Sequence, residues 1–230
     1  MSPALWDVTR LFAPSDCLTC GFGETGPLCL PCLNNLEVAA GRGCRRCSNP
    51  VVADSAASCP WCRALTEAPH HLSALYCFRD GGREMYHLVK YAGYWRLLDA
   101  MLQHRLDVLL SVLPMEQYSC VVPIPESLSR RFKRFFNPAA QLAHYLSLAT
   151  GIPVRQHLRI RPWQKRQVGL SREERRKNTQ DRFRVCGSPP RSVLLVDDVM
   201  TTGSTLESAQ RALQAAGVEQ VGWMTLFRTL

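Results

Sequence analysis

One stretch near the C-terminus constrains the fold more than any other part of the sequence. Residues 193–196 are four consecutive apolar residues, and the carboxylates of Asp197 and Asp198 follow them directly. Residues 201–205 then read Thr-Thr-Gly-Ser-Thr, and a helical pattern begins there. Open α/β sheets bind their ligands at the carboxyl ends of parallel strands, where turns of this kind lie. The stretch therefore predicts an α/β fold with a mainly parallel sheet flanked by helices, and a ligand site at this turn.

The turn after the two acids has the properties of a phosphate site. Its backbone N–H groups, its hydroxyls and the positive end of the following helix all suit a phosphate group. A carboxylate repels phosphate, so Asp197 and Asp198 suit sugar hydroxyls or a Mg²⁺ ion that bridges to the ligand. A plain surface turn before a capped helix is the structural alternative. The residues expected at the phosphate are Thr201, Thr202, Gly203, Ser204 and Thr205.

After residue 70 the chain alternates short apolar runs with helical patterns, which supports the same fold class. Leucines recur at helical spacing after Trp95. Asn137 followed by Pro138 is a strong helix start, and Gly151 is typical of a helix end. We expect strands at 73–78, 119–124, 192–196 and 218–227, and helices over 95–113, 137–151 and 204–216. Gly81 and Gly82 end the first strand and precede an amphipathic stretch that ends near Tyr91.

The N-terminal part is dominated by cysteine, with eight of the eleven cysteines in four Cys-x-x-Cys pairs. Two sulfurs three positions apart can face one metal ion, and two such turns complete the four-thiolate shell of a structural zinc. Disulfides are rare in a reducing compartment and are the weaker explanation, together with a redox pair. The predicted Zn²⁺ ligands are Cys17, Cys20, Cys29, Cys32, Cys44, Cys47, Cys59 and Cys62.

The four pairs allow more than one division into two sites. Sequential sites, with the first two pairs on one ion and the last two on another, close short ribbons and are favoured; interleaved sites are the alternative. We expect residues 1–70 to form a double zinc-ribbon module and residues 71–230 to form the α/β domain. Cys77, Cys120 and Cys186 lie in apolar or strand-like contexts and are expected to be buried small hydrophobic residues.

The positive charge of the chain is concentrated in one segment. The chain has 28 Lys and Arg against 19 Asp and Glu, and residues 115–190 hold 15 of the basic and 5 of the acidic side chains. Phe132, Phe135, Phe136 and Trp163 are interleaved with the basic residues. Three readings stay open: donors to a diphosphate, a single-stranded nucleic-acid surface in which aromatics stack bases, or a solvated basic face.

The sequence has no sign of membrane targeting. The first ten residues lack the basic start and apolar run of a signal peptide. The longest stretch without charged residues, 135–154, contains prolines and polar side chains and is a poor membrane span. We therefore expect a cytoplasmic protein.

Residues 193–205 resemble the thirteen-residue signature of the type I phosphoribosyltransferases, which bind phosphoribosyl pyrophosphate. The resemblance implies that Asp197 and Asp198 hold the ribose hydroxyls. It also implies that the loop from Thr201 to Thr205 holds the 5′-phosphate, with Mg²⁺ bridging the diphosphate and the ribose.

The order of motifs along nearly the whole chain narrows the resemblance. The cysteine pairs are followed by Lys90-Tyr-Ala-Gly93, Val122-Pro-Ile-Pro125, a basic stretch ending in Phe136-Asn137, residues 161–178, the phosphate turn and a closing Phe227-Arg-Thr-Leu230. This order resembles the ComF family of double-zinc-ribbon, phosphoribosyltransferase-like proteins. The chain departs from the family pattern at Phe135 and Pro138, where Gly and Gln are usual.

The family resemblance leaves two classes of function open. It implies a role in natural transformation or the use of external DNA, on the cytosolic side, with the helicase that takes up single strands. An enzyme would transfer the phosphoribosyl group to an acceptor and release pyrophosphate. A binding protein would use the pocket as a sensor, or keep it as a vestige, and bind single-stranded DNA and uptake partners. The sequence identifies neither an acceptor nor a catalytic residue.

Overall fold

The computed structural model describes residues 16–23, 26–40, 44, 59–60, 62, 65, 68–91, 95–126, 137–161 and 182–229. The predicted alternation of strands and helices is present within these residues. The helices are α2 (Leu30–Asn34), α4 (Asp80–Tyr91), α5 (Trp95–Val112), the 3₁₀ helix η1 (Met115–Gln117), α7 (Pro138–Thr150) and α9 (Ser204–Ala215). The strands are β1 (Leu72–Cys77), β2 (Cys120–Pro123), β3 (Leu158–Ile160), β4 (Phe183–Val185), β5 (Ser192–Met200) and β6 (Gln220–Arg228).

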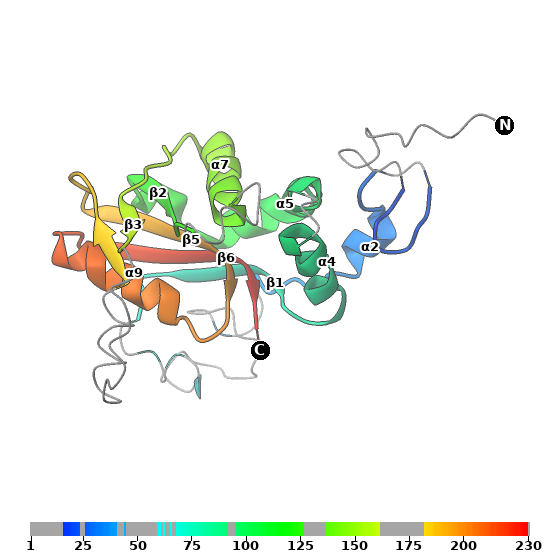
Figure 1. The fold of residues 1–230 in the computed structure, drawn as a ribbon, viewed down its shortest axis with the longest axis horizontal. Coiled ribbons are helices and arrows are strands. Elements are labelled where there is room, and N and C mark those ends of the chain that lie inside the picture. The colour runs from blue at the N-terminus through cyan, green and yellow to red at the C-terminus, as the bar shows by residue number, and fades with distance from the viewer. Residues whose placement is uncertain are drawn as a thin grey trace.

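A parallel sheet forms the centre of the molecule. Its strands lie in the order β1-β6-β5-β2, and every neighbouring pair is parallel. Helices α5 and α7 cover one face of this sheet and α9 covers the other, as Figure 1 shows. A separate antiparallel pair is formed by β3 and β4. The predicted α/β fold class, with a mainly parallel sheet flanked by helices, is confirmed.

Both faces of the central strand β5 are buried, which explains its continuous apolar run. Leu194 and Val196 pack into one hydrophobic cluster with residues of α5 and α7. Val193 and Leu195 pack into a second cluster with Leu206 and other residues of α9. Side chains alternate between the faces of a strand. Asp198 therefore belongs to the α5 and α7 face, and Asp197 to the α9 face.

Strand β5 is longer than the sequence pattern predicted. The apolar run ends at Val196, which pairs with Pro123 at the end of β2. Pairing with β6 nevertheless continues, with Asp197 opposite Thr225 and Met200 opposite Arg228. The strand persists because one neighbour still satisfies its backbone groups. Among the described residues, the two acids consequently lie where β5 pairs with β6 but no longer with β2.

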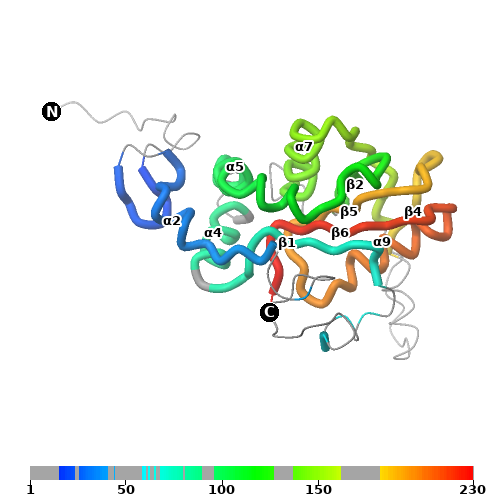
Figure 2. The backbone as a smooth tube through the Cα atoms, turned by 180° about the vertical axis from the view of Figure 1, so that it is seen from behind, coloured from blue at the N-terminus to red at the C-terminus, as the bar shows by residue number. Residues whose placement is uncertain are grey.

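The first cysteine-rich segment lies at one end of the molecule beside α4 and α5, as the blue region of Figure 2 shows. Val38 forms an antiparallel bridge with Tyr76 of β1, and the N–H of Ala39 donates to the carbonyl of Leu75. At a kink in α5, Arg105 donates to Asn34 Oδ1 at 3.3 Å. The segment is therefore joined to β1 by backbone hydrogen bonds and to α5 by a side-chain hydrogen bond.

Two predicted features of the remaining chain have simple outcomes. Cys77 and Cys120 are buried, as expected for small hydrophobic residues, whereas Cys186 is half-buried.

Among the helices in the described ranges, none combines the length and the apolar character that crossing a bilayer requires.

Asn137 connects the end of β2 to the start of α7, as its position in the sequence suggested. Its Oδ1 accepts from the N–H of Ala139 at 2.9 Å, and its amide donates to the carbonyl of Ile124 at 3.0 Å. At the other end of the helix, Gly151 has a left-handed backbone with φ 76°. Asn137 thus caps α7 and also joins the start of this helix to Ile124, on the other side of the segment 127–136, which lies outside the described residues.

We expect Asn137→Ala to lower the free energy of unfolding by about 1–2 kcal/mol, because the variant loses the cap and the link. Asn137→Asp is the matched control, since a carboxylate still caps the helix but cannot donate to Ile124. Urea unfolding monitored by circular dichroism measures both variants. Equal stability of Asn137→Ala and the parent protein would contradict this assignment.

Candidate functional site

The turn between β5 and α9 has the geometry of an open anion cradle. Gly203 occupies the N-cap position of α9 with a left-handed backbone, φ 83° and ψ −6°, which disfavours any residue with a side chain. No side chain caps the helix at this position. The first N–H groups of a helix need an acceptor from outside the helix. A phosphate oxygen can supply that acceptor here.

The hydroxyls of the turn lie on the outside of the protein. Thr201, Thr202 and Ser204 are exposed, and Thr205 is half-buried. Thr202 Oγ1 donates to Ser204 Oγ at 3.1 Å and accepts weakly from the Ser204 N–H at 3.4 Å. The hydroxyls therefore gather at the start of α9, where solvent and ligands reach them.

Both acids are half-buried and are held by the backbone of their own strand. Asp197 Oδ1 accepts from the N–H of Asp198 at 2.9 Å. Asp198 Oδ1 accepts from the N–H of Val199 at 2.8 Å. The structure thus places the two carboxylates directly beside the turn, one toward each face of the sheet.

One residue of the site has no signal in the sequence. Tyr86 of α4 donates its hydroxyl to Asp198 Oδ2 at 2.8 Å, although 112 positions separate the two residues. The pattern of α4 predicts only that the helix is amphipathic. An alternation of apolar and polar residues does not specify which tyrosine reaches across to another strand, so sequence reasoning missed it.

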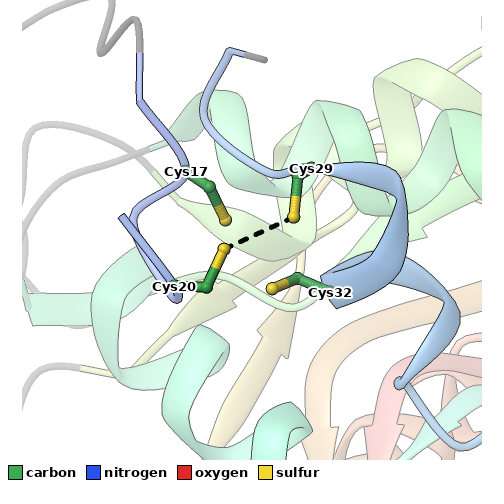
Figure 3. Close-up of side chains that lie close together, drawn as sticks. All are labelled: Cys17, Cys20, Cys29 and Cys32. Atoms are coloured by element: carbon green, nitrogen blue, oxygen red, sulfur yellow. Dashed lines mark hydrogen bonds between the residues drawn. The ribbon is translucent and has the colours of Figure 1, made fainter. Parts of the chain in front are cut away.

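Four of the predicted metal ligands meet at the N-terminal end of the molecule. The sulfurs of Cys17, Cys20, Cys29 and Cys32 all lie within 4.8 Å of one another. Figure 3 shows them converging from a tight turn on one side and from the start of α2 on the other. Four thiols at this separation can surround one ion as a tetrahedral shell. The group could therefore hold a metal ion.

The proton affinities of these thiols differ strongly. Burial by itself raises the pKa of Cys17, but the backbone N–H groups of Cys20, Cys29 and Thr19 bring it down to about 6. Burial, together with the neighbouring thiols of Cys29, Cys20 and Cys17, raises the pKa of Cys32 far above its ordinary value. A bound cation offsets the mutual repulsion of thiolates, so metal binding releases these protons.

A second cysteine group lies beneath the sheet. Cys44, Cys59 and Cys62 are buried, and their sulfurs lie within 4.8 Å of one another. Their predicted partner Cys47 lies outside the described residues. The grouping follows the sequential division of the pairs. The second group belongs to the same hydrophobic cluster as α9, so it could hold a metal ion close to the phosphate turn's helix.

The described part of the basic segment concentrates arginine on the pair β3 and β4. Arg159 stands directly opposite Arg184 in the antiparallel register, and both side chains are exposed. Like charges placed opposite each other destabilise a strand pair. The remaining basic stretches, 127–136 and 162–181, lie outside the described residues with their interleaved aromatics. The pair therefore presents a surface that an anion would stabilise.

A family model described as "Phosphoribosyl transferase domain" matches residues 185–230, which include β5, α9 and β6. The matched segment contains the two acids and the whole phosphate turn. It thus covers the part of the chain on which the candidate site is built.

Three curated proteins resemble the chain. "Competence protein F" of Haemophilus influenzae is 36% identical over 107 residues, which are 44% of this chain and 46% of that protein, so the match spans about half of it. "Competence protein ComFC" of Streptococcus pneumoniae is 25% identical over 215 residues, 87% of each chain. "Competence protein ComFC" of Bacillus subtilis is 26% identical over 216 residues, 88% of this chain and 84% of that protein.

We expect Cys29→Ser to remove about one metal ion per chain, because the first group then lacks one of its four thiolates. Plasma mass spectrometry of the purified protein measures the metal. Cys77→Ser is the matched control, since Cys77 is an equally buried thiol outside both groups whose pKa burial raises to about 11. The same metal content in all three proteins would refute the assignment of the first group.

Proposed function

We propose that this chain, which belongs to the ComF family of phosphoribosyltransferase-like proteins, binds phosphoribosyl pyrophosphate together with Mg²⁺. The observation that carries the proposal is the turn at Gly203, where an uncapped helix start and exposed hydroxyls directly follow two carboxylates. A ligand with a phosphate on one end and sugar hydroxyls beside it satisfies both halves of this arrangement.

Each half of the site has its own task in this proposal. The loop from Thr201 to Thr205 donates backbone N–H groups and hydroxyls to the 5′-phosphate. Asp197 and Asp198 accept from the ribose hydroxyls, and their negative charge keeps the phosphate on the loop. Mg²⁺ would offset the negative charge of the diphosphate, and the carboxylates of Asp197 and Asp198 are the groups of this site that could hold it. The chain's own contribution is to position the ligand and to balance its charge.

The two cysteine groups are proposed to hold structural Zn²⁺. Four sulfurs within 4.8 Å of one another suit the tetrahedral Cys₄ shell that zinc prefers. We propose residues 1–70 as the double zinc-ribbon module that carries both sites. A full thiolate shell leaves no open position for substrate, so the role of these ions is to stabilise the fold.

The names of the three relatives support a role in competence for this chain. In this proposal the protein acts in the cytoplasm during natural transformation, with the helicase that takes up single strands as a candidate partner. Phosphoribosyl pyrophosphate is then either the substrate of a transfer reaction or a metabolite that the protein senses.

We expect Mg²⁺ and phosphoribosyl pyrophosphate at about one hundred times the dissociation constant to raise the unfolding temperature by about 5 °C or more. Asp197→Asn combined with Asp198→Asn should abolish the shift, because the ribose hydroxyls lose both negatively charged hydrogen-bond acceptors. Differential scanning fluorimetry measures it. Asp107→Asn, an exposed acid on α5, is the control and should keep the full shift.

Equal shifts in the parent protein and the double variant would show that Asp197 and Asp198 do not hold the ligand. With the shift established, pyrophosphate release on addition of candidate acceptors separates an enzyme from a sensor. Release requires that an acceptor attack the ribose, so a sensor releases none above the background of the free ligand.

A second candidate function, binding of single-stranded DNA, is favoured by the arginines of β3 and β4. Arg159 and Arg184 repel each other across the strand pair, and neither strand contains an acidic residue. Arg161 donates to the carbonyl of Phe183 at 3.2 Å and adds charge at the same end. A nucleic-acid backbone would relieve this repulsion, because its phosphates neutralise the charge of the arginines. Each such contact also releases a counterion, which makes binding depend on salt.

We expect Arg159→Gln combined with Arg184→Gln to reduce the salt dependence of binding to labelled oligo(dT). The slope of log K against log salt should fall by about 1.4, because each lost contact to a single strand contributes about 0.7. Fluorescence anisotropy at several salt concentrations measures it. Arg191→Gln is the control for loss of an arginine outside β3 and β4, since Arg191 pairs with Glu219 at 3.4 Å. Identical slopes for the double variant and this control would exclude β3 and β4 as the DNA surface.

A further inference from the structure

Each oxygen of the Asp198 carboxylate accepts a hydrogen bond from a different part of the chain. The N–H of Val199 donates to one of its oxygens at 2.8 Å, and the hydroxyl of Tyr86 donates to the other at 2.8 Å. A carboxylate offers about four lone pairs. These two bonds restrain the plane of the carboxylate. The orientation of Asp198 is therefore set by a residue of another helix, α4.

Tyr86 is itself held rigidly. Only 5% of its surface is exposed. Its ring packs edge-on against Phe78, with centroids 5.4 Å apart, and against Phe227 at the end of β6, with centroids 5.8 Å apart. Edge-to-face contacts restrain the ring, and a ring fixed in this way fixes the direction of its hydroxyl. The Tyr86 side chain therefore has little conformational freedom, and its hydroxyl is held in the direction of Asp198.

The close approach of α4 to the sheet depends on Gly82. A Cβ at this position would lie 2.7 Å from the carbonyl oxygen of Cys77 and 3.1 Å from Cε1 of Phe227. The first contact is with backbone at the end of β1, which cannot move aside easily. A Cβ at the neighbouring Gly81 would meet nothing within 4 Å. Gly82 therefore lets α4 lie close enough for Tyr86 to reach β5.

We propose that Tyr86 is a positioning residue that orients the Asp198 carboxylate toward the ribose hydroxyls, with Gly82 setting its reach. This inference rests on the proposed binding of phosphoribosyl pyrophosphate. Without the Tyr86 hydroxyl the carboxylate loses one of the donors that restrain its plane, and the ligand must supply part of that ordering on binding. Affinity falls by the cost of that ordering.

The first test removes the hydroxyl and keeps the ring. We expect Tyr86→Phe to weaken binding of Mg²⁺ and phosphoribosyl pyrophosphate about tenfold by isothermal titration calorimetry, the effect of one hydrogen bond to a charged group. Tyr76→Phe is the matched control, because the Tyr76 hydroxyl donates at the same 2.8 Å but to the carbonyl of Met101. Both variants lose one hydrogen bond, which is buried at Tyr76 and partly buried at Tyr86, and only Tyr86→Phe should lose affinity.

A second variant disturbs the contact between Tyr86 and Asp198 while keeping the Tyr86 hydroxyl. Gly82→Ala displaces α4 and should weaken binding to a similar extent, whereas Gly81→Ala should leave the affinity unchanged. The pair keeps the test valid if Tyr86→Phe does not fold. Normal affinity in Gly82→Ala and in Tyr86→Phe would overturn the proposal.

Coupling between variants separates positioning from a general loss of structure. Tyr86→Phe should cause the same tenfold loss when combined with Asp197→Asn, and little further loss when combined with Asp198→Asn. Equal further losses in both backgrounds would overturn the positioning role. If the parent protein binds no phosphoribosyl pyrophosphate, the proposed function fails and this role fails with it. If the parent binds and Tyr86→Phe binds equally well, only the positioning role fails.

Discussion

The parallel pairing of β5 with β6 is the contact on which the rest of the structure depends. It joins the outer strands β1 and β2 into one sheet, and it runs from Ser192 to Met200 along the whole of β5. Strand β2 stops at the level of Val196 while β6 continues. Among the described residues, Asp197 and Asp198 therefore lie where β5 pairs with β6 alone, and both are half-buried. The position of the acids is thus a consequence of register.

The same strand explains why two neighbouring acids have different surroundings. Side chains alternate along a strand, so Asp197 follows Val193 and Leu195 toward α9, and Asp198 follows the opposite face toward α4. The turn at Gly203 completes the α9 side, and the Tyr86 hydroxyl completes the other. A ligand bound at this edge would therefore lie between α4 and α9, two helices that are far apart in the sequence.

Local patterns predicted the parts of this structure that local physics determines. Asn137 and Gly151 mark the ends of α7 because capping is a property of a few adjacent residues. The apolar run before Asp197 likewise predicted a buried strand and the turn after it. The extension of β5 past Val196 and the bond between Tyr86 and Asp198 escaped prediction, because both depend on which elements meet in the folded chain. The division into modules at residue 70 stays a prediction.

Each of the two cysteine groups shares a hydrophobic cluster with residues near the candidate site. The first shares a hydrophobic cluster with Met85 and Tyr86 of α4, the helix that holds Asp198. The second shares a cluster with Met200 and Leu206, which flank the phosphate turn. Short cysteine-rich segments bury too little apolar surface to be rigid alone, and a metal ion makes them so. A metal ion held at either group would therefore act on the site through packing and not through contact with a ligand.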